Sequence, residues 1–410
     1  MKRRLIWGPV FGFGLVSLAA DVVSDGARPL AGPLLAQLGA SALLVGLVTG
    51  GAEAAAQGLR LVFGPWADRT RQYWTFTMAG YALTAVCVPL LALAPVAGAS
   101  GLGLACALII GDRVGKAVRS PAKTVLLAAA AKPVGRGRGF AVHKSLDLTG
   151  ALLGPLIVSA VIAATGLMSA AFAALTIPAA VALSLLVWLR RRVQNPGSDR
   201  PPPADTAVGP RSDAAGADAA SPASKPASVF SGIFILFAVA SFFWSAGLVA
   251  FGVISFHLTT AVAVPVSVVP LLYAAAMGAA ALGALASGVL YDRGGAAVLL
   301  ALPVLIAAVP VLALARDTAL VLAGVLLWGI ATGIQDSTVK ALVADLVPER
   351  RQGTAYGVFA AFEGGGALAG GALYGALYDS RPLLITAVAV LQAVALVLLV
   401  ASLWMPRRTV

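Results

Sequence analysis

The sequence predicts an all-α polytopic membrane protein with twelve transmembrane helices in two pseudo-symmetric six-helix bundles. Three observations lead to this fold class. Hydrophobic residues make up 60% of the 410 residues and charged residues only 11%, whereas charged residues are about a quarter of an average soluble chain. The apolar residues fall in long runs, and a spanning helix needs about 20 such residues. One polar stretch divides the runs into two sets of six.

Glycines, prolines and charge clusters separate the twelve apolar segments. The segments lie near residues 6–32, 40–63, 73–95, 102–131, 139–164, 168–189, 229–258, 266–290, 296–315, 318–347, 354–378 and 383–404. The first segment follows a basic N-terminus and continues past Asp21 with helical character, so we expect an uncleaved span. A secretory signal peptide is the alternative, because Leu18-Ala19-Ala20 is similar to a cleavage site.

Basic residues mark one side of the membrane. The Lys and Arg residues at one set of alternating segment ends are Lys2, Arg3, Arg4, Arg69, Arg71, Lys132, Arg136, Arg138, Arg190, Arg191, Arg192, Arg293, Arg350, Arg351, Arg407 and Arg408. The opposite loops carry only Arg316 and Arg381. By the positive-inside rule, both termini are cytoplasmic in an inner-membrane, multi-pass protein. This distribution also explains the net charge of +12 without nucleic acid as a partner.

A polar stretch divides the chain into domains. From Gln194 to Ser228 the sequence is rich in Pro, Ala, Ser and Asp, with no periodicity and little apolar side chain to offset the entropy of ordering. We therefore expect an N-terminal bundle at 1–190, a flexible cytoplasmic linker at 191–228 and a C-terminal bundle at 229–410.

The two halves share an internal repeat. Without a gap, Ser120–Asp147 aligns with Asp336–Glu363, so that the two final carboxylates coincide. The same alignment pairs Gly150 with Gly366 and Gly154 with Gly370. A second correspondence follows segments two and eight and pairs Gly64, Asp68 and Arg69 with Gly288, Asp292 and Arg293. Many transporters contain such repeats and bind substrate where the halves meet.

These motifs resemble those of the major facilitator superfamily over nearly the whole chain. The family signature G-x-x-x-D-R-x-G-R is matched at Gly64, Asp68 and Arg69, while Arg71 and Gln72 depart from it. The resemblance implies a gating role for both loop copies, in which an Asp at a helix end latches the halves in the outward-open state. A plain loop turn with solvated charges is the alternative.

The fifth segment is similar to the superfamily's antiporter motif. Gly150-x3-Gly154-Pro155 matches part of that motif, although Val158-Ser159 replaces its trailing glycines. Small residues also allow close helix approach whatever the transport direction. Three stretches resemble a largely uncharacterised prokaryotic subgroup of predicted efflux permeases. These stretches are Asp21-x3-Asp25, the run from Asp112 to Pro121, and the run from Gly137 to Asp147.

Ionisable residues inside spans are functional candidates because burying a charge in a membrane is costly. The proton-coupling and charge-relay candidates are Asp21, Glu53, Asp147, Arg119, Lys116, Asp112 and Glu363. The charged stripe of the fourth segment, with helical spacing from Asp112 to Lys123, is expected to face the central cavity. We expect a carboxylate among Asp21, Glu53 and Asp147 to exchange protons with both sides, while Arg119 or Lys116 stabilises its charged form in one state. Permanent ion pairing between helices is the alternative.

A second set of residues is expected to line the substrate cavity. It comprises Asp25, Arg28, Lys144, Trp244, Trp328, Asp336 and Lys340. The basic surplus inside the N-terminal half favours an anionic or carboxylate-bearing substrate. Asp25 and Arg28 could instead be solvated near the outer surface, and the aromatic residues could serve packing alone. His143 and His257 have no partner at metal-ligand spacing, so we expect structural roles and no metal site.

The function predicted is secondary active transport of a small organic molecule by alternating access, with proton-coupled efflux ahead of proton-coupled uptake. The partners expected are the substrate, protons and the lipid bilayer, with no cofactor and no second subunit. A membrane-embedded enzyme is the remote alternative. Asp25-Gly26-Ala27-Arg28 lacks the spacing of a lipid head-group transferase motif, and no nucleophile and base stand together, so we expect no catalytic residue.

Overall fold

The computed structural model describes residues 2–193, 232–347 and 352–404, and these residues form helices without a strand. The N-terminal elements are α1 (Lys2–Ala27), η1 (Arg28–Leu30), α2 (Ala31–Gln37), α3 (Ala42–Gly58), α4 (Arg60–Thr70), α5 (Tyr73–Leu90), η2 (Leu91–Val96), η3 (Gly98–Ser100), α6 (Gly101–Ala131), η4 (Lys132–Val134), α7 (Arg136–Thr165), α8 (Met168–Ala174) and α9 (Thr176–Arg190). The C-terminal elements are α10 (Gly232–Gly247), α11 (Phe251–Thr260), α12 (Val269–Gly294), η5 (Gly295–Leu300), α13 (Ala301–Ala313), α14 (Thr318–Leu346), α15 (Gln352–Ala376) and α16 (Arg381–Trp404).

Helices occupy all twelve segments that the sequence predicts to span the membrane. Several spans are interrupted: α1 passes through η1 into α2 at Pro29, and α10 is separated from α11 at residues 248–250. Nine helical stretches of the described residues are long and apolar enough to cross a membrane. The all-α polytopic fold is therefore confirmed, while the number of crossings stays a prediction.

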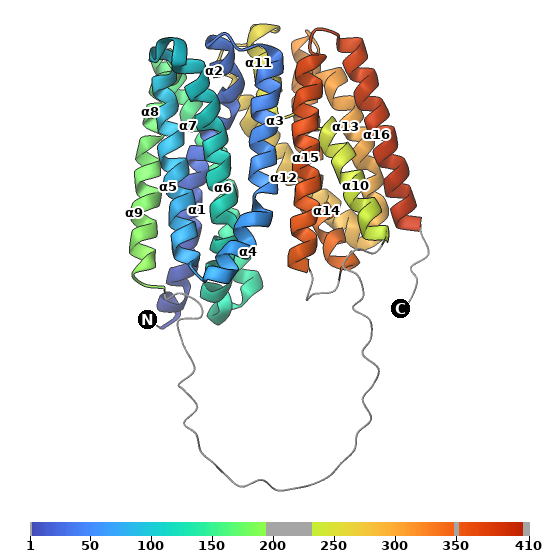
Figure 1. Ribbon diagram of the computed structural model, residues 1–410. Helices are drawn as coiled ribbons and strands as arrows, with labels where there is room; N and C mark the ends of the chain where they lie inside the picture. The colour runs from blue at the N-terminus through green and yellow to red at the C-terminus, as the bar shows by residue number, and fades with distance from the viewer. Residues whose placement is uncertain (1, 194–231, 348–351, 405–410) are drawn as a thin grey trace, which may run out of the picture.

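The helices gather in two groups (Figure 1). Helices α1 and α5 to α9 lie on one side, helices α10, α13, α14 and α16 lie on the other, and α3 packs against α15 between them. The start of α1 and the end of α16 lie at the same end of the molecule. We call this the terminal end. The predicted linker at 191–228 falls almost entirely outside the described residues, so the domain division stays a prediction.

Glycines set the closest helix contacts within each group. A Cβ at Gly150 or Gly154 of α7 would meet the backbone of α1 at Leu18 and Val22. The equivalent glycines of the repeat, Gly366 and Gly370 of α15, meet the backbone of α10 in the same way. The repeat seen in the sequence therefore corresponds to one packing arrangement used twice, in which missing side chains let two helix backbones touch.

The closest backbone-to-backbone contacts between the two groups lie toward the end opposite the terminal end. Gly46 and Gly50 of α3 meet Gly371 of α15, with backbone against backbone. The hydroxyl of Ser159 on α7 donates a hydrogen bond of 2.6 Å to the carbonyl oxygen of Ser267, which precedes α12. Helix α2 contacts α11 at the same end (Figure 1). These contacts close the space between the groups on that side. Further contacts continue toward the terminal end, where a Cβ at Gly357 of α15 would meet the side chain of Leu61 on α4.

We expect Gly154→Ala to lower the midpoint of thermal unfolding of the detergent-purified protein. The added methyl group would lie 2.8 Å from the backbone nitrogen of Gly26, which cannot move without shifting α1. Overpacking of this kind costs about 1–3 kcal/mol. Gly278→Ala in α12 is the matched control, because nothing lies within 4 Å of the new Cβ. Equal midpoints for the two variants would show that the α1–α7 contact is not tight.

Candidate transport site

Two clusters of polar side chains are formed mainly by helices of the N-terminal group, and most of these side chains are buried or half-buried. The outer cluster comprises Ser24 and Asp25 of α1, Arg28 of η1, Glu53 of α3, Asp112 and Arg113 of α6, and Tyr273 of α12. The inner cluster comprises Ser17 and Asp21 of α1, Lys123 of α6, and His143, Lys144 and Asp147 of α7. Asp21 and Asp25 lie one helical turn apart, so α1 links the two clusters.

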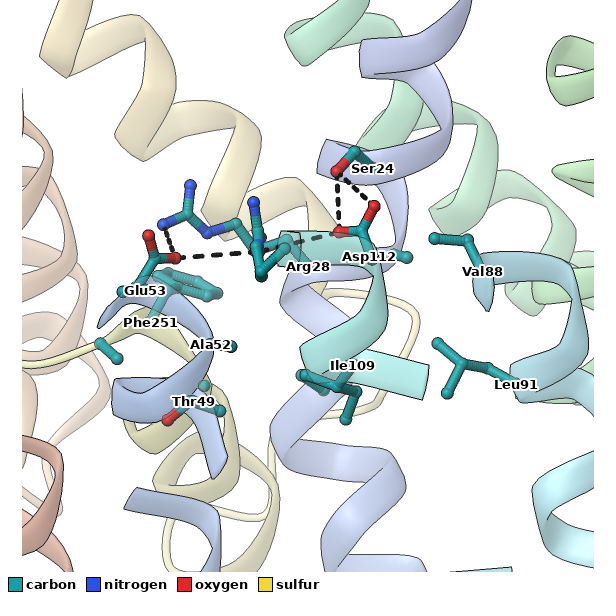
Figure 2. A pocket seen from close by; sticks show the side chains of 15 residues that line it. Ser24, Arg28, Thr49, Ala52, Glu53, Val88, Leu91, Ile109, Asp112 and Phe251 are labelled. Atoms are coloured by element: carbon teal, nitrogen blue, oxygen red, sulfur yellow. Dashed lines mark hydrogen bonds and ion pairs between the residues drawn. The ribbon is translucent and has the colours of Figure 1, made fainter. Parts of the chain in front are cut away.

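Glu53 lies between two arginines in the outer cluster. One carboxylate oxygen, Oε1, forms a close ion pair with the guanidinium of Arg28. The same oxygen lies 4.0 Å from Nε of Arg113. Arg113 also pairs with the Oδ2 atom of Asp112 at 3.7 Å. Figure 2 shows the Arg28 guanidinium directed at the Glu53 carboxylate. The arrangement compensates charges that would be costly alone in the membrane interior.

Two neutral hydroxyl groups hold the remaining carboxylates of the outer cluster. The hydroxyl of Ser24 donates to both oxygens of Asp112, at 3.1 and 2.9 Å (Figure 2). The hydroxyl of Tyr273 donates to Asp25 at 3.3 Å and accepts from Arg28 at 3.3 Å. Because Tyr273 belongs to α12, this contact joins the two helix groups through polar side chains.

A small cavity lies beside the outer cluster. Its polar lining includes Ser24, Arg28, Thr49 and Glu53, and its volume is about 40 Å³. That space accommodates a few water molecules. It is far below the roughly 300–1,000 Å³ of sites that enclose drug-sized ligands. Phe251 of α11 contributes to the wall (Figure 2). The cavity in this conformation is therefore a contracted space between the groups, with no room for a complete organic substrate.

A carboxyl pair lies at the centre of the inner cluster. The side chains of Asp21 and Asp147 lie close enough to interact electrostatically. Two neighbouring carboxylates repel each other, and a proton on one of them relieves that repulsion. Lys144 donates to Oδ2 of Asp147 at 2.8 Å. Helices α1 and α7 therefore bring two carboxyl groups and one lysine together, an arrangement that could hold a proton.

The remainder of the inner cluster connects three helices. The ammonium group of Lys123 donates to the hydroxyl oxygen of Ser17 at 3.0 Å. Nε2 of His143 lies 3.0 Å from the same oxygen. The ring of His143 is buried and has a hydrogen-bonding partner, which fits the structural role expected for it.

The predicted charge partners occupy different positions. Lys116 is buried close enough to interact electrostatically with Asp21 and Asp25. Arg119 instead turns toward α5, where it donates to Thr84 at 2.6 Å and lies 4.7 Å from the ring centre of Tyr81. The stripe on α6 therefore does not face the central space as one surface. Its side chains divide between α1 and α5 because those helices supply the polar partners.

Other predicted site residues lie apart from the two clusters. Glu363 is buried on α15 and accepts a hydrogen bond of 2.8 Å from Gln335. Asp336 is exposed and interacts electrostatically with Arg60 of α4. The side chain of Lys340 lies outside the described part of the structure.

The two tryptophans expected to form a cavity wall are buried in this conformation. Trp244 is fully buried against Phe237 and Phe359 in the core of the C-terminal group. Trp328 donates from Nε1 to the carbonyl oxygen of Val249 at 2.7 Å. Neither residue lines the cavity beside the outer cluster.

The residues of the predicted gate are exposed at the terminal end. Asp68 and Arg69 lie on α4, and Asp68 accepts a hydrogen bond of 3.2 Å from Tyr73 in the same half. Asp292 and Arg293 lie in the last turn of α12. Gly64 lies near Pro121, whereas a Cβ at Gly288 would meet nothing within 4 Å. Among the ion pairs of the described residues, none involves a gate residue, so no such latch is formed there.

Two important members of the outer cluster could not be selected from the sequence. Arg113 follows Asp112 directly and therefore points about 100° away from the charged stripe on α6. Tyr273 is a single polar aromatic residue in the other half, and local spacing does not connect it with Asp25. By contrast, the alternative that Asp25 and Arg28 are merely solvated near the outer surface is wrong, because both belong to the buried network.

Comparisons with known proteins agree on one family. The sequence model of the Major Facilitator Superfamily matches residues 13–371 and 233–410. An uncharacterized protein of Mycobacterium tuberculosis is 49% identical over 399 residues, which cover 96% of this chain and 93% of that protein. An uncharacterized MFS-type transporter of Methanocaldococcus jannaschii is 29% identical over 147 residues, or 35% of each chain.

Solved structures of transporters have a similar fold. The nucleoside transporter NupG has a TM-score of 0.67 at 13% identity, with 97% of this chain and 100% of that chain covered. A D-xylose-proton symporter has a TM-score of 0.65 at 12% identity, covering 98% and 96%. A bacterial homolog of the human lysosomal transporter Spinster, in an inward-facing and unoccupied conformation, has a TM-score of 0.64 at 14% identity, covering 97% and 95%.

We expect the stability effects of Arg28→Gln and Glu53→Gln to be non-additive. Each single change leaves a buried charge without its partner, whereas the double change removes both charges. A double-mutant cycle of thermal or denaturant unfolding should therefore give a favourable coupling of about 1–3 kcal/mol. Additive effects would indicate that the close pair contributes nothing to stability.

Proposed function

The chain belongs to the Major Facilitator Superfamily, and on that premise we propose that it is a proton-coupled exporter of small organic anions. The family makes it a multi-pass membrane protein and a secondary transporter rather than an enzyme. The resemblance to an uncharacterised prokaryotic subgroup is likewise shown, since its relatives in the mycobacteria are themselves uncharacterized. The proposal adds the coupling ion, the direction and the class of substrate.

The carboxyl pair of Asp21 and Asp147 is the observation that carries the proposal of proton coupling. These side chains interact electrostatically, and a proton on one of them would relieve the repulsion between their charges. They lie on two different helices, so a change in the packing of α1 against α7 would separate them. Separation would remove that repulsion and favour release of the proton, while the nearby Lys144 would stabilise the resulting carboxylate. The proton would thus be coupled to a movement of helices.

Two features support export of an anion. The glycines of the antiporter-like motif pack α7 directly against α1. Asp21 and Asp147 lie on these same two helices, so a change in this packing would change the distance between them. Arg119, deep in the same half, makes its described contacts with neutral Thr84 and Tyr81. A positively charged interior favours an anionic substrate. Uptake by symport could use the same proton pair, so the direction rests on the motif and on flux measurements.

The contacts between the helix groups support an inward-facing assignment for this conformation. The closest backbone contacts between the groups, at Gly46, Gly50 and Gly371, lie away from the terminal end. The exposed Asp68 and Asp292 at the terminal end form no described ion pair. Because both termini are predicted to be cytoplasmic, the side that these glycine contacts close faces away from the cytoplasm. The gate residues would then latch in the opposite state.

We expect Asp147→Asn to abolish pH-driven flux in proteoliposomes while sparing exchange of labelled for unlabelled substrate. The amide cannot take up or release a proton, but it keeps nearly the same shape. Asp379→Asn, on the exposed loop before α16, is the matched control and should retain both activities. Equal loss of both activities in Asp147→Asn would indicate a structural role for the carboxylate and would remove the main support for proton coupling.

The orientation predicts a simple labelling pattern. In a background without Cys87 and Cys106, Ser380→Cys should react with a membrane-impermeant maleimide on intact cells. Thr70→Cys, at the terminal end, should react only after the membrane is permeabilised. Both positions are exposed, so access to the reagent decides the result. The reverse pattern would place the termini outside and overturn the inward-facing assignment.

A further inference from the structure

We propose that Glu53 occupies the position of a substrate carboxylate between Arg28 and Arg113. In this view the two guanidiniums form the anion subsite of the transporter, and Glu53 fills the subsite when no substrate is bound. The inference rests on the proposed export of organic anions and deepens it. It assigns the group of the substrate that is recognised, a carboxylate, and the residues that recognise it.

The contacts of the three outer carboxylates distinguish Glu53 from the other two. Asp112 is held by the hydroxyl of Ser24, and Asp25 is held by the hydroxyl of Tyr273. The described polar contacts of Glu53 are with Arg28 and Arg113 alone. A guanidinium presents several N–H donors in a plane and recognises a carboxylate with high geometric selectivity. Another carboxylate could therefore replace Glu53 without breaking a hydrogen bond to a neutral group.

The exposure of the side chains shows how replacement could occur. The side chains of Glu53 and Arg28 each retain 24% of their accessible surface, whereas Arg113 retains only 6%. Arg113 is thus the buried end of the subsite, and Glu53 lies at its accessible edge. The small cavity beside them is bordered by Ile109 and Phe251, which offer apolar surface to the remainder of a carboxylate substrate.

Basic side chains outnumber acidic ones around Glu53. The groups that face or neighbour Glu53 are Arg28 of η1, Arg60 of α4, Asp112, Arg113 and Lys116 of α6, and Asp336 of α14. The negative charge of Glu53 balances part of this basic environment. A substrate carboxylate that takes the place of Glu53 supplies the same negative charge to both arginines. Glu53 and the substrate anion therefore compete for one place.

The test uses the full-length purified protein with sodium acetate as the probe and acetamide as its neutral analogue of the same shape. At alkaline pH, Glu53→Gln should be stabilised against thermal unfolding by acetate. Its apparent dissociation constant for acetate should be about tenfold lower than that of the unchanged protein, which corresponds to about 1.4 kcal/mol of removed competition. Acetamide should have no effect.

Matched variants show whether the two arginines form the subsite. Glu363→Gln removes the other buried intramembrane glutamate of the described residues and should respond to acetate as the unchanged protein does. Adding Arg113→Gln to Glu53→Gln should abolish the acetate response. If Glu53→Gln does not fold, Glu53→Asp is the second variant: its shorter side chain reaches the arginines less well, so acetate should stabilise it more strongly than the unchanged protein.

Several outcomes would overturn the inference. Equal stabilisation by acetate and acetamide, or by acetate and chloride, would exclude a carboxylate-selective subsite. An unaltered acetate response in the variant with both Arg113→Gln and Glu53→Gln would place the binding elsewhere. A proton-driven flux that depends on Asp147, combined with no acetate response, would contradict this inference and leave the proposed proton coupling intact. If the flux does not depend on Asp147 but acetate still stabilises Glu53→Gln, the carboxylate subsite is supported and the proposed proton coupling is contradicted.

Discussion

The need to neutralise charge inside a membrane governs the organisation of this transporter. A lone charged side chain costs several kcal/mol in that environment. Asp25, Arg28, Glu53 and Arg113 meet the requirement by sharing partners from α1, α3, α6 and α12. Such a network holds the helices in one arrangement, yet each group in it can take another partner of suitable charge. The same property would let a bound ion or substrate influence the positions of the helices.

The two halves use this constraint unequally. The N-terminal group contains both polar clusters, whereas the core of the C-terminal group is built from aromatic and aliphatic side chains such as Phe237, Trp244 and Phe359. Their glycine contacts are nevertheless equivalent, with α7 on α1 and α15 on α10. The common glycine contacts give both halves the same helix packing. The charged side chains that could bind protons or substrate lie mainly in the N-terminal half. The hydrogen bond from Tyr273 to Asp25 links the outer cluster to the C-terminal half.

Features with a strong periodic or compositional signal could be predicted from the sequence. Apolar runs gave the helices, and the aligned glycines gave a repeat that the packing of α7 and α15 reproduces. The direction of individual side chains was harder to predict. Spacing placed Arg119 on one stripe with Lys116, but a hydroxyl and an aromatic ring on α5 attract its guanidinium instead. Arg113 was not selected because its partner Glu53 comes from a distant segment.

The backbone contacts at Gly150, Gly154, Gly366 and Gly370 also limit how the sequence can drift. Where two side chains touch, enlargement of one can be relieved by shrinkage of the other. At these positions the neighbour of a new side chain is the main chain of Leu18, Val22, Phe242 or Ala246, which no substitution can make smaller. A second mutation therefore cannot compensate for a larger residue at these contacts. Each helix crossing requires glycine whatever other substitutions the protein acquires.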